Sequence, residues 1–535
     1  MSLNRRTFIK GTAFAGGAAA LLGLAGCAPA ASSDVKAADT GSSASGWRTA
    51  PDPIPDDKIT ETVEADLVVV GAGNAGCVAA VSAVEDGASV VLLQKGSTVF
   101  CHGDVWAANG TTVQEAAGVK QDGWEVVNDL ELGAENRAKV EVLRNWVNYS
   151  GEVANWLIPK IEDYGMGPVI VDVPVEADDE WNHGFPVVHL MGGANGAHNT
   201  FPGFMQYMVD NADASLLDVR YDSPAVQLQR DESGKVVGVI AEQKGGGYLL
   251  CKGAKGIILA AGDYGNDPEM RDEFLPHAIG LPAGYSNTYD TGDGHKIGFW
   301  AGAAMQQGPH ACNIHYDPGI NVPEYPGTLM PWLRVNKNGE RFSNEDRPYE
   351  QLYAKDVAQP DCMHFQVFDA NYATDVKSMG TSGFMRGDWE AIVPAAIEAG
   401  DIYQGDTLEE LAEAMGVPAD AFVATVTRYN ELCEKGYDED FGKQARRLKP
   451  VAQAPFYALA RQPVCLTPLG GLEVNGDMQV LDTEGNVIEG LYAAGNNSGN
   501  FFGGLVQRMS AGGMGVGRAV LTGRVAAKRA LGINY

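Results

Sequence analysis

The chain has few basic residues and no closely spaced pairs of cysteines. It contains 39 Lys and Arg against 69 Asp and Glu, a formal net charge of −30 at pH 7. Nucleic-acid binding needs clustered basic side chains against phosphates, so this balance excludes a nucleic-acid partner. It also argues against docking on anionic lipid by charge alone.

None of the eight cysteines forms a C-x-x-C pair or a C-x-x-C-H haem site. Nothing in their spacing supports an iron–sulfur cluster, and Cys77, Cys251 and Cys433 are expected to be small buried hydrophobic residues.

Long apolar runs are also missing, apart from one short run near the N-terminus. Ala13 to Leu24 is apolar and too short to span a bilayer. It follows Arg5-Arg6, a pattern typical of a twin-arginine signal peptide. The run ends in Leu24-Ala-Gly-Cys27, which resembles the bacterial lipobox, where a diacylglycerol is attached to the cysteine thiol. We therefore expect an extracytoplasmic protein anchored to the cell membrane by a lipid on Cys27. The alternative is a plain signal peptide cut near Ala28, with Cys27 buried.

The rest of the chain is long enough for more than one domain. Residues 1–27 form the predicted signal, and residues 28–60, rich in Ala, Ser, Asp and Pro, form a predicted flexible tether. The 535 residues are 45% hydrophobic, which is enough for a large core. The 67 glycines exceed the usual share of about 7%. They predict many places where backbone passes close to backbone or to a ligand.

Globular structure is predicted to begin with a dinucleotide-binding motif. Ala65 to Val70 reads as a buried strand, Gly71-x-Gly73-x-x-Gly76 follows at once, and Cys77 to Gly87 has a helical pattern. In this context the glycines allow a tight turn, an approach to a pyrophosphate, and close packing of helix on strand. The helix N-terminus then offers N–H groups to phosphates. The acidic residue that normally ends the second strand is replaced by Gln94, followed by Lys95.

Four later segments favour a flavin over a nicotinamide. A second strand ends in small residues at Ala261-Gly262, a tight turn carries Asp293, and a third strand ends at Gly495-Asn496. A glycine-rich segment, Ser510 to Arg518, then opens a final helix. A nicotinamide dehydrogenase needs one such site near its start, whereas a long extended cofactor wrapped by both ends of the chain explains all of them.

In this order the segments resemble the flavoprotein family of fumarate reductase, urocanate reductase and 3-ketosteroid Δ1-dehydrogenase, over about Asp66 to Leu531. The resemblance implies an α/β fold. A split Rossmann-like FAD-binding domain would occupy residues 61–308 and 469–535, and an inserted α+β substrate-capping domain residues 309–468. The FAD is expected to be non-covalent, because the family's covalent histidine or threonine signals are not identifiable. The cofactor-binding positions that carry over are Gly71, Gly73, Ala75, Gly76, Gln94, Lys95, Gly103, Asn109, Ala261, Asp293, Asn496, Met514 and Gly515.

The predicted cap contains the family's V-N-x-x-G-x-R-F-x-N-E block at residues 335–345. Fumarate reductases place their proton-donating arginine four residues after that Glu. This chain has Tyr349 there, preceded by proline as in the steroid dehydrogenases, so the resemblance implies Tyr349 as the proton donor. Asn344 and Glu345 are expected to brace the cap, and Thr407 to Lys435 to form a packed cap helix, because it has helical periodicity.

Two other family features are altered. The histidine that holds a substrate carboxylate before a Met-Gly-Gly is absent from Thr467-Pro-Leu-Gly-Gly, so fumarate itself is not the expected substrate. The steroid dehydrogenases' second Tyr-Pro-Gly is also absent, and Arg508 lies near the family's carboxylate-binding arginine. His315 and His310 lie near the cap-entrance histidine; a lone histidine is more often structural. The candidate catalytic residues are therefore Tyr349, Arg508 and His315.

Three functions remain open from the sequence. The first is an extracytoplasmic reductase of a C=C bond conjugated to a carbonyl or carboxylate. Its substrate would be a small unsaturated organic acceptor, and its electrons would come from a membrane cytochrome or another quinol-oxidising partner. The second is a 3-ketosteroid-type dehydrogenase that introduces such a bond. The third is a non-enzymatic flavin electron-transfer protein, which the complete cap block argues against.

Overall fold

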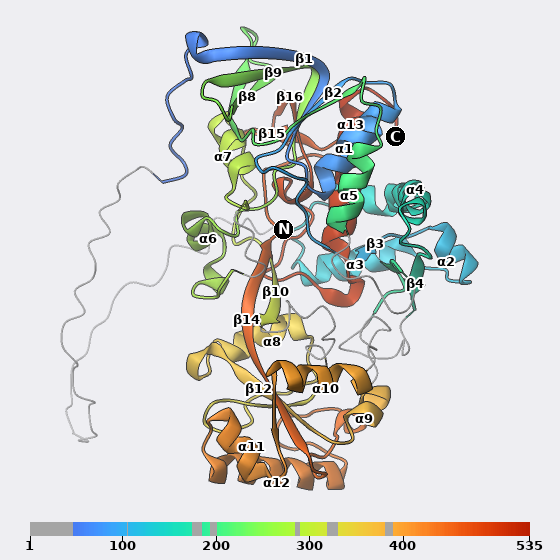
Figure 1. Ribbon diagram of the computed structural model, residues 1–535, viewed down its shortest axis with the longest axis vertical. Coiled ribbons are helices and arrows are strands. Elements are labelled where there is room, and N and C mark those ends of the chain that lie inside the picture. Colours follow the sequence, from blue (N-terminus) through green and yellow to red (C-terminus); the bar gives the residue numbers. More distant parts are fainter. Residues whose placement is uncertain are drawn as a thin grey trace, which may run out of the picture. The chain divides into compact units, whose positions relative to one another are not determined.

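Short runs of Val, Leu and Ile form the buried centre of an eight-stranded sheet (Figure 1). The computed structural model describes residues 46–103, 105–173, 184–192, 201–283, 289–317, 330–379 and 389–535, all within one compact unit, Ser45–Tyr535. The predicted signal with Cys27 and the first half of the predicted tether lie outside these residues. The strands are β1 (Ile59–Val70), β2 (Val90–Leu93), β6 (Leu217–Arg220), β7 (Ala225–Arg230), β8 (Val236–Glu242), β9 (Tyr248–Leu259), β15 (Gln479–Leu481) and β16 (Val487–Ala493).

Parallel pairing brings the ends of four strands together. The order is β15-β16-β9-β1-β2-β6, with β8 paired to β9 and β7 to β8. The contacts β16–β9–β1–β2–β6 are all parallel. Val70 pairs with Leu93 and Leu259, and Leu259 pairs with Ala493. The loops that follow these strands therefore leave from one edge, the carboxyl edge at which open α/β sheets bind ligands. The predicted α/β class is confirmed.

Helices α1 (Asn74–Glu85), α7 (Asp293–Trp300) and α13 (Met514–Ala530) pack on this sheet. Next to them, α5 (Phe201–Asp210) packs on α1 and α4 (Val140–Asp163) packs on α13. α6 (Pro268–Phe274) lies in a separate apolar cluster that includes Cys312 and Cys465. α1 is buried from Ala75 to Val84 and packs on α13 and α5. An added Cβ at Gly523 of α13 would lie 2.2 Å from the carbonyl oxygen of Ala75, so glycine allows the two helices to approach closely. β3 (Val105–Ala107), β5 (Val188–Leu190) and β4 (Ile170–Asp172) form a small sheet beside α2 (Thr112–Ala116) and α3 (Gly123–Gly133).

A second large sheet carries the predicted cap. Its strands are β10 (Cys312–Asp317), β11 (Leu333–Val335), β12 (His364–Asp369), β13 (Ile402–Gly405) and β14 (Phe456–Pro468), in the antiparallel order β10-β14-β12-β11 with β13 beside β14. Helices α11 (Leu408–Met415) and α12 (Ala419–Lys435) pack on Phe365 and Val367. On the other face, α9 (Tyr372–Met379) and α10 (Trp389–Ala399) pack on Phe368. The chain enters this sheet through β10 and leaves it through β14 (Figure 1).

The predicted cap helix over Thr407 to Lys435 is wrong in one respect, because the segment forms two helices. α11 ends at a left-handed Gly416, with φ +70°, and α12 begins after Pro418. The domain boundaries at 309 and 468 stay predictions.

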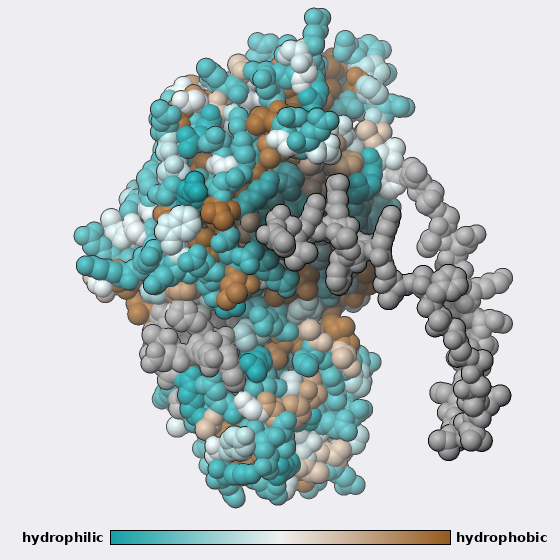
Figure 2. Space-filling model, turned by 180° about the vertical axis from the view of Figure 1, so that it is seen from behind, coloured by the Kyte–Doolittle hydropathy of each residue, from teal (hydrophilic) through white to brown (hydrophobic). Residues whose placement is uncertain are grey.

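The face of the molecule shown in Figure 2 is mostly hydrophilic, with apolar residues scattered over it. Within the described ranges, no helix is both long enough and apolar enough to cross a membrane.

Candidate active site

The loop after β1 and the first turn of α1 hold three glycines with different surroundings. Gly71 has φ +102°, and an added Cβ would lie 2.4 Å from the carbonyl oxygen of Ala260. At Gly76, a Cβ would lie 1.8 Å from the carbonyl oxygen of Gly71. At Gly73 the one neighbour among the described residues within 4 Å of an added Cβ would be the carbonyl oxygen of Phe100, at 3.5 Å. Gly71 and Gly76 are therefore required by packing, whereas the backbone at Gly73 faces open space.

α1 begins at this open space. Its N-cap is Gly73, and in the described part of the chain no side chain caps its first turn. A helix N-terminus left this way carries a partial positive charge and free donors, which suit a phosphate. Ala75 lies on the buried side of the same turn, where a Cβ at Gly495 would approach its side chain to 2.9 Å.

The loop after β2 joins two of the predicted segments. The ammonium group of Lys95 lies 2.8 Å from Oδ2 of Asp293 and 2.7 Å from the hydroxyl of Thr291. Gln94 is buried, and its side chain is already used within the loop: Nε2 donates to the carbonyl oxygen of Thr98 at 2.7 Å, and Oε1 accepts from the N–H of Lys95 at 3.1 Å. The structure thus gives Gln94 a loop-bracing contact, and its expected bond to a ribose stays a prediction.

The loops after β9 and β16 meet the end of β14 and helix α13 in a polar cluster, which we call the polar junction: Asp263, Thr467, Asn496, Asn497 and Arg518. Asp263, Asn497 and Arg518 are buried, whereas Thr467 and Asn496 are half-buried. Asn497 accepts from the N–H of Ala261 at 2.6 Å and donates to the carbonyl oxygen of Gly262 at 3.1 Å. Asn496 donates to Asp263 at 3.3 Å and accepts from the guanidinium of Arg518. The predicted residues Ala261 and Asn496 are therefore held by side chains from across the sheet edge.

Burial controls the charges in the polar junction. Desolvation raises the pKa of Asp263 to about 6, against the opposing effect of hydrogen bonds from Thr467, Gly265 and Asn496. Desolvation also lowers the pKa of Arg518 to about 9, partly offset by the charge of Asp263. Both shifts disfavour the charged forms, as expected for groups removed from water. Near neutral pH the carboxyl group of Asp263 is therefore mostly ionised, beside the buried cation of Arg518.

α13 supplies the second open helix N-terminus. Its N-cap, Gly513, has φ +75°, and an added Cβ would lie 2.8 Å from the backbone of Trp106. Met514 is buried, whereas the one described atom near a Cβ at Gly515 would be Oε1 of Gln507, at 3.7 Å. Among the residues that the structure describes, no side chain caps this helix either. Gly515 thus resembles Gly73, since its backbone faces open space at the start of a helix.

Gly103 and Asn109 shape the loops between these helices. Gly103 has φ +118°, and a Cβ there would lie 2.5 Å from Cγ2 of Val516. The amide of Asn109 donates to the carbonyl oxygen of Gln121 at 3.0 Å and accepts from Gln114 at 3.2 Å. Both residues therefore have packing or bracing contacts within the protein.

The three predicted catalytic residues come from separate elements. Tyr349 is the first residue of α8 (Tyr349–Asp356), and its side chain lies outside the described part of the structure. α8 packs on β10, which carries the half-buried His315, and on β14. The guanidinium of Arg508 lies 2.9 Å from Oδ1 of Asp129 on α3. Arg508 is therefore an ion-paired residue, and its predicted role as a carboxylate clamp must compete with that partner.

His310 is a buried structural residue. Its Nε2 donates to the carbonyl oxygen of Gln306 at 2.8 Å, so its Nδ1 accepts from the hydroxyl of Tyr264 at 2.8 Å. The ring also stacks on Phe274. Burial lowers the pKa of His310 to about 4, so the ring is neutral at physiological pH.

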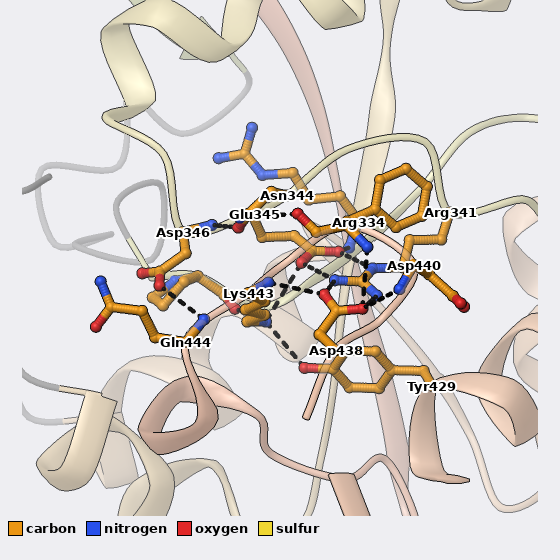
Figure 3. Close-up of polar contacts among 12 residues, drawn as sticks. Arg334, Arg341, Asn344, Glu345, Asp346, Tyr429, Asp438, Asp440, Lys443 and Gln444 are labelled. Carbon is orange, nitrogen blue, oxygen red and sulfur yellow. Dashed lines mark hydrogen bonds and ion pairs between the residues drawn. The ribbon is translucent and has the colours of Figure 1, made fainter. Parts of the chain in front are cut away.

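The family block in the cap lies in a buried network of charges (Figure 3). Arg341 contacts Glu345 and Asp438, each at 2.8 Å, and the ammonium group of Lys443 lies 3.5 Å from Glu345. Burial alone would raise the pKa of Glu345, but Lys443 and Arg341 outweigh it and hold that pKa below its usual value. Asn344 donates to the carbonyl oxygen of Phe441 at 3.2 Å. Asn344 and Glu345 thus brace the cap, as the sequence predicted.

Comparison with known proteins decides the family. Residues 66–513 match the protein family described as FAD binding domain. The chain belongs to this FAD-binding family. Vinyl phenol reductase of Lactiplantibacillus plantarum is 28% identical and matches over 82% of this chain and 90% of its own length. Urocanate reductase of Eggerthella lenta is 28% identical over 87% of this chain and 75% of its own. The open conformation of a flavocytochrome c3 fumarate reductase superposes with a TM-score of 0.69 at 25% identity, covering 90% of this chain and 81% of that one.

This flavoprotein is an oxidoreductase, and its sheet edge suits FAD. The two uncapped helix starts at Gly73 and Gly515 are open where a Cβ would otherwise stand, which fits the close approach of a diphosphate. Lys95 with Asp293 on one side, and the polar junction on the other, border the same edge of parallel strands. Segments up to several hundred residues apart therefore meet at this edge, and the cofactor-binding role of each predicted residue stays a prediction.

Sequence reasoning missed four residues of the polar junction: Asp263, Thr467 as a contact, Asn497 and Arg518. Asp263 and Asn497 directly follow the small-residue strand ends Ala-Ala-Gly262 and Ala-Ala-Gly495-Asn496. A polar residue that directly follows a strand ending in small residues could have identified Asp263 and Asn497 as site residues. Arg518 had none, since an arginine within a helix is usually a surface residue.

Proposed function

We propose that this flavoprotein reduces a C=C bond activated by a conjugated carbonyl or carboxylate group, and that it uses the unsaturated compound as an electron acceptor outside the cytoplasm. The observation that carries the proposal is the position of α8. This helix, which begins at Tyr349, packs on β10 and β14, the two strands that lead from the FAD-binding edge into the cap. The reductase names of the relatives support the same reaction class.

In the proposed mechanism FAD, when bound, supplies a hydride to one carbon of the activated bond. Tyr349 donates the proton to the neighbouring carbon. A phenol with a pKa of about 10 keeps its proton at neutral pH and can still give it to a carbanion-like centre. The Glu345 network fixes the segment just before α8, so it positions Tyr349. His315, on the strand beside α8, is the second candidate donor.

The pair between Arg508 and Asp129 bears on the substrate's charge. An arginine that already faces a carboxylate gains less from a substrate carboxylate than a free arginine would. Thr467, at the position of the family's carboxylate-holding histidine, bonds to Asp263 within the polar junction. We therefore expect neutral enones to serve as acceptors alongside enoates. Electrons would arrive from a membrane cytochrome or a quinol-oxidising protein, and the lipid on Cys27 would hold the enzyme near that partner.

The experiment is anaerobic oxidation of the dithionite-reduced protein by matched enones and enoates. At least one acceptor should restore the oxidised flavin spectrum and be recovered in the saturated form. In Arg508→Ala, oxidation by enoates should slow more than oxidation by enones. If no activated alkene oxidises the protein while a saturated ketosteroid reduces its flavin, the enzyme is a dehydrogenase and the proposal fails.

A further inference from the structure

Two buried cysteines meet between the strands that connect the cap to the rest of the enzyme. Cys312 is the first residue of β10, and Cys465 lies near the end of β14. Their sulfur atoms are 2.6 Å apart. Unbonded heavy atoms settle at about 3.5–4.0 Å, so the two sulfur atoms are much closer than a simple packing contact.

The strand register places both side chains on one face. Ile314 pairs with Cys465, and Cys312 lies two residues before Ile314 on the same strand. Residues two apart in a strand point to the same side, so Cys312 and Cys465 are diagonal neighbours. A register shift between Asn313 and Ile314 alters the regular ladder at this point.

The backbone holds the pair from both sides. The N–H of Cys312 donates to the carbonyl oxygen of Leu505 at 2.9 Å, and the N–H of Cys465 donates to that of Pro282 at 2.9 Å. The side chains are 0% and 1% exposed within an apolar cluster that includes Tyr264 and Phe274. Burial raises the pKa of the Cys312 thiol, so the two cysteines are unreactive unless β10 and β14 separate enough to expose them.

We propose that Cys312 and Cys465 form a disulfide that joins the two strands through which the chain enters and leaves the cap. Its formation breaks two S–H bonds and makes one S–S bond. Two protons and two electrons pass to an oxidised low-molecular-weight disulfide such as oxidised glutathione, which leaves as two thiols. The bond closes a loop between residues 153 apart, which contains the five-stranded sheet except the last three residues of β14.

The disulfide would restrict motion between β10 and β14. With the bond closed, these two strands cannot slide or separate where they leave the FAD-binding edge. A crosslink that closes a long loop also stabilises the folded chain by restricting the unfolded one. The oxidised enzyme is therefore more resistant to heat than the dithiol form. This inference does not depend on which substrate the enzyme uses.

The test is a thiol map of the full-length holoenzyme after incubation with oxidised glutathione. The protein is denatured in acid, alkylated without reductant and digested. We expect the peptides of Cys312 and Cys465 to appear as one crosslinked species that separates on reduction, while Cys251, another buried thiol, is alkylated. Alkylation of both cysteines, or a separate glutathione on each, would overturn the proposal.

Thermal unfolding supplies a second readout. Oxidised wild type should unfold a few degrees above the same protein heated with reductant. Cys312→Ser/Cys465→Ser should show no such difference, whereas Cys251→Ser should keep it. An equal effect of reductant on wild type and on the double variant would also overturn the proposal. If the double variant does not fold, the thiol map of the wild type still decides.

Discussion

Asp263 is a buried carboxyl group that receives hydrogen bonds from neutral donors: Thr467, Asn496 and the N–H of Gly265. Burial raises its pKa from 3.8 in the unfolded chain to about 6 in the folded one. The folded state therefore holds this proton more tightly. The resulting stabilisation is complete below pH 4 and is lost as the pH rises through 6. A difference of about two pKa units between the folded and unfolded chain corresponds to about 3 kcal/mol in the free energy of unfolding.

Asp263→Asn should remove this dependence on pH. The amide keeps an acceptor oxygen but does not titrate, so the variant should gain stability relative to wild type between pH 4 and 7. Melting temperatures across that range measure the difference, with Asp52→Asn on the exposed N-terminal segment as the control. A constant difference between variant and wild type would mean that Asp263 does not titrate in this window.

Gly73 and Gly76 make different demands within one motif. Gly73→Ala places its Cβ in open space, so the fold should survive while FAD binding weakens by roughly tenfold, about 1.4 kcal/mol. Gly76→Ala forces a Cβ onto the carbonyl oxygen of Gly71, so folding itself should lose about 1–3 kcal/mol. Flavin titration of the apoprotein, with denaturant unfolding alongside, separates the two effects. Equal losses of stability in both variants would remove the argument that Gly73 faces the cofactor.

Tyr349→Phe keeps the ring and removes the transferable proton. The variant should bind FAD and be reduced by dithionite normally, because neither process uses the phenol. Its oxidation by an activated alkene should slow by about 10²–10⁴, the usual contribution of general acid catalysis. Tyr353→Phe, one turn later in α8, is the matched control. Should Tyr349→Phe oxidise as fast as wild type, His315 or Arg347 becomes the donor to test.

Single residues were predictable where the backbone alone decides their role. The three motif glycines behave as the strand–turn–helix context required, since two are enforced by packing and one faces open space. Gln94 and Arg508 were not, because their roles depend on partners that the sequence does not reveal. Arg508 meets Asp129, and Gln94 meets the carbonyl oxygen of Thr98. The position of a residue in a motif predicts where its backbone lies, whereas the contacts of its side chain depend on how distant segments pack.

At the scale of elements, hydrophobic periodicity and turn residues predicted strands and helices, but they did not predict every break within a helical segment. The strand β1, the helix α1 and the strand β2 follow the expected order. The segment after Thr407 keeps a helical period through its break, so periodicity alone joined α11 to α12. Gly416 and Pro418 marked the break: glycine accepts the left-handed conformation that ends a helix, and a helix readily begins just after proline.

The charges of the cap block join the segment after β11 to the segment after α12. Glu345→Ala leaves Arg341 and Lys443 without their shared buried partner, so the protein should lose about 3–5 kcal/mol of stability. Glu439→Ala removes a partner of Lys435 on the exposed face of α12 and should change stability little. Denaturant unfolding of both variants measures the contrast. Similar losses would show that the buried network does not stabilise the cap.

At the scale of the whole molecule, the order of the segments was predictable from the sequence, but the contacts between distant loops were not. Lys95 contacts Asp293, and Ala261 contacts Asn497, across 198 and 236 residues. These contacts follow from the order β16-β9-β1-β2, in which late and early strands are neighbours. The family resemblance predicted a FAD-binding domain split between the two ends of the chain. Composition and periodicity could not predict the strand order, because a buried parallel strand has the same apolar pattern wherever it lies in the sheet.

The predicted anchor concerns where the whole enzyme works. Cys27→Ser should release the protein from membranes into the extracytoplasmic soluble fraction with its FAD content unchanged, because Cys27 lies before the compact unit, Ser45–Tyr535. Two or three acyl chains hold a protein stably at a bilayer where one does not, so loss of the lipid should be decisive. Arg5→Lys with Arg6→Lys is the companion variant: it should block export and leave folded, FAD-loaded protein inside the cell. Fractionation followed by a high-salt wash and flavin quantification measures both outcomes. Cys27→Ser protein that remains on washed membranes would show that something other than a lipid holds it there, and the electron-donating partner would then be the first candidate.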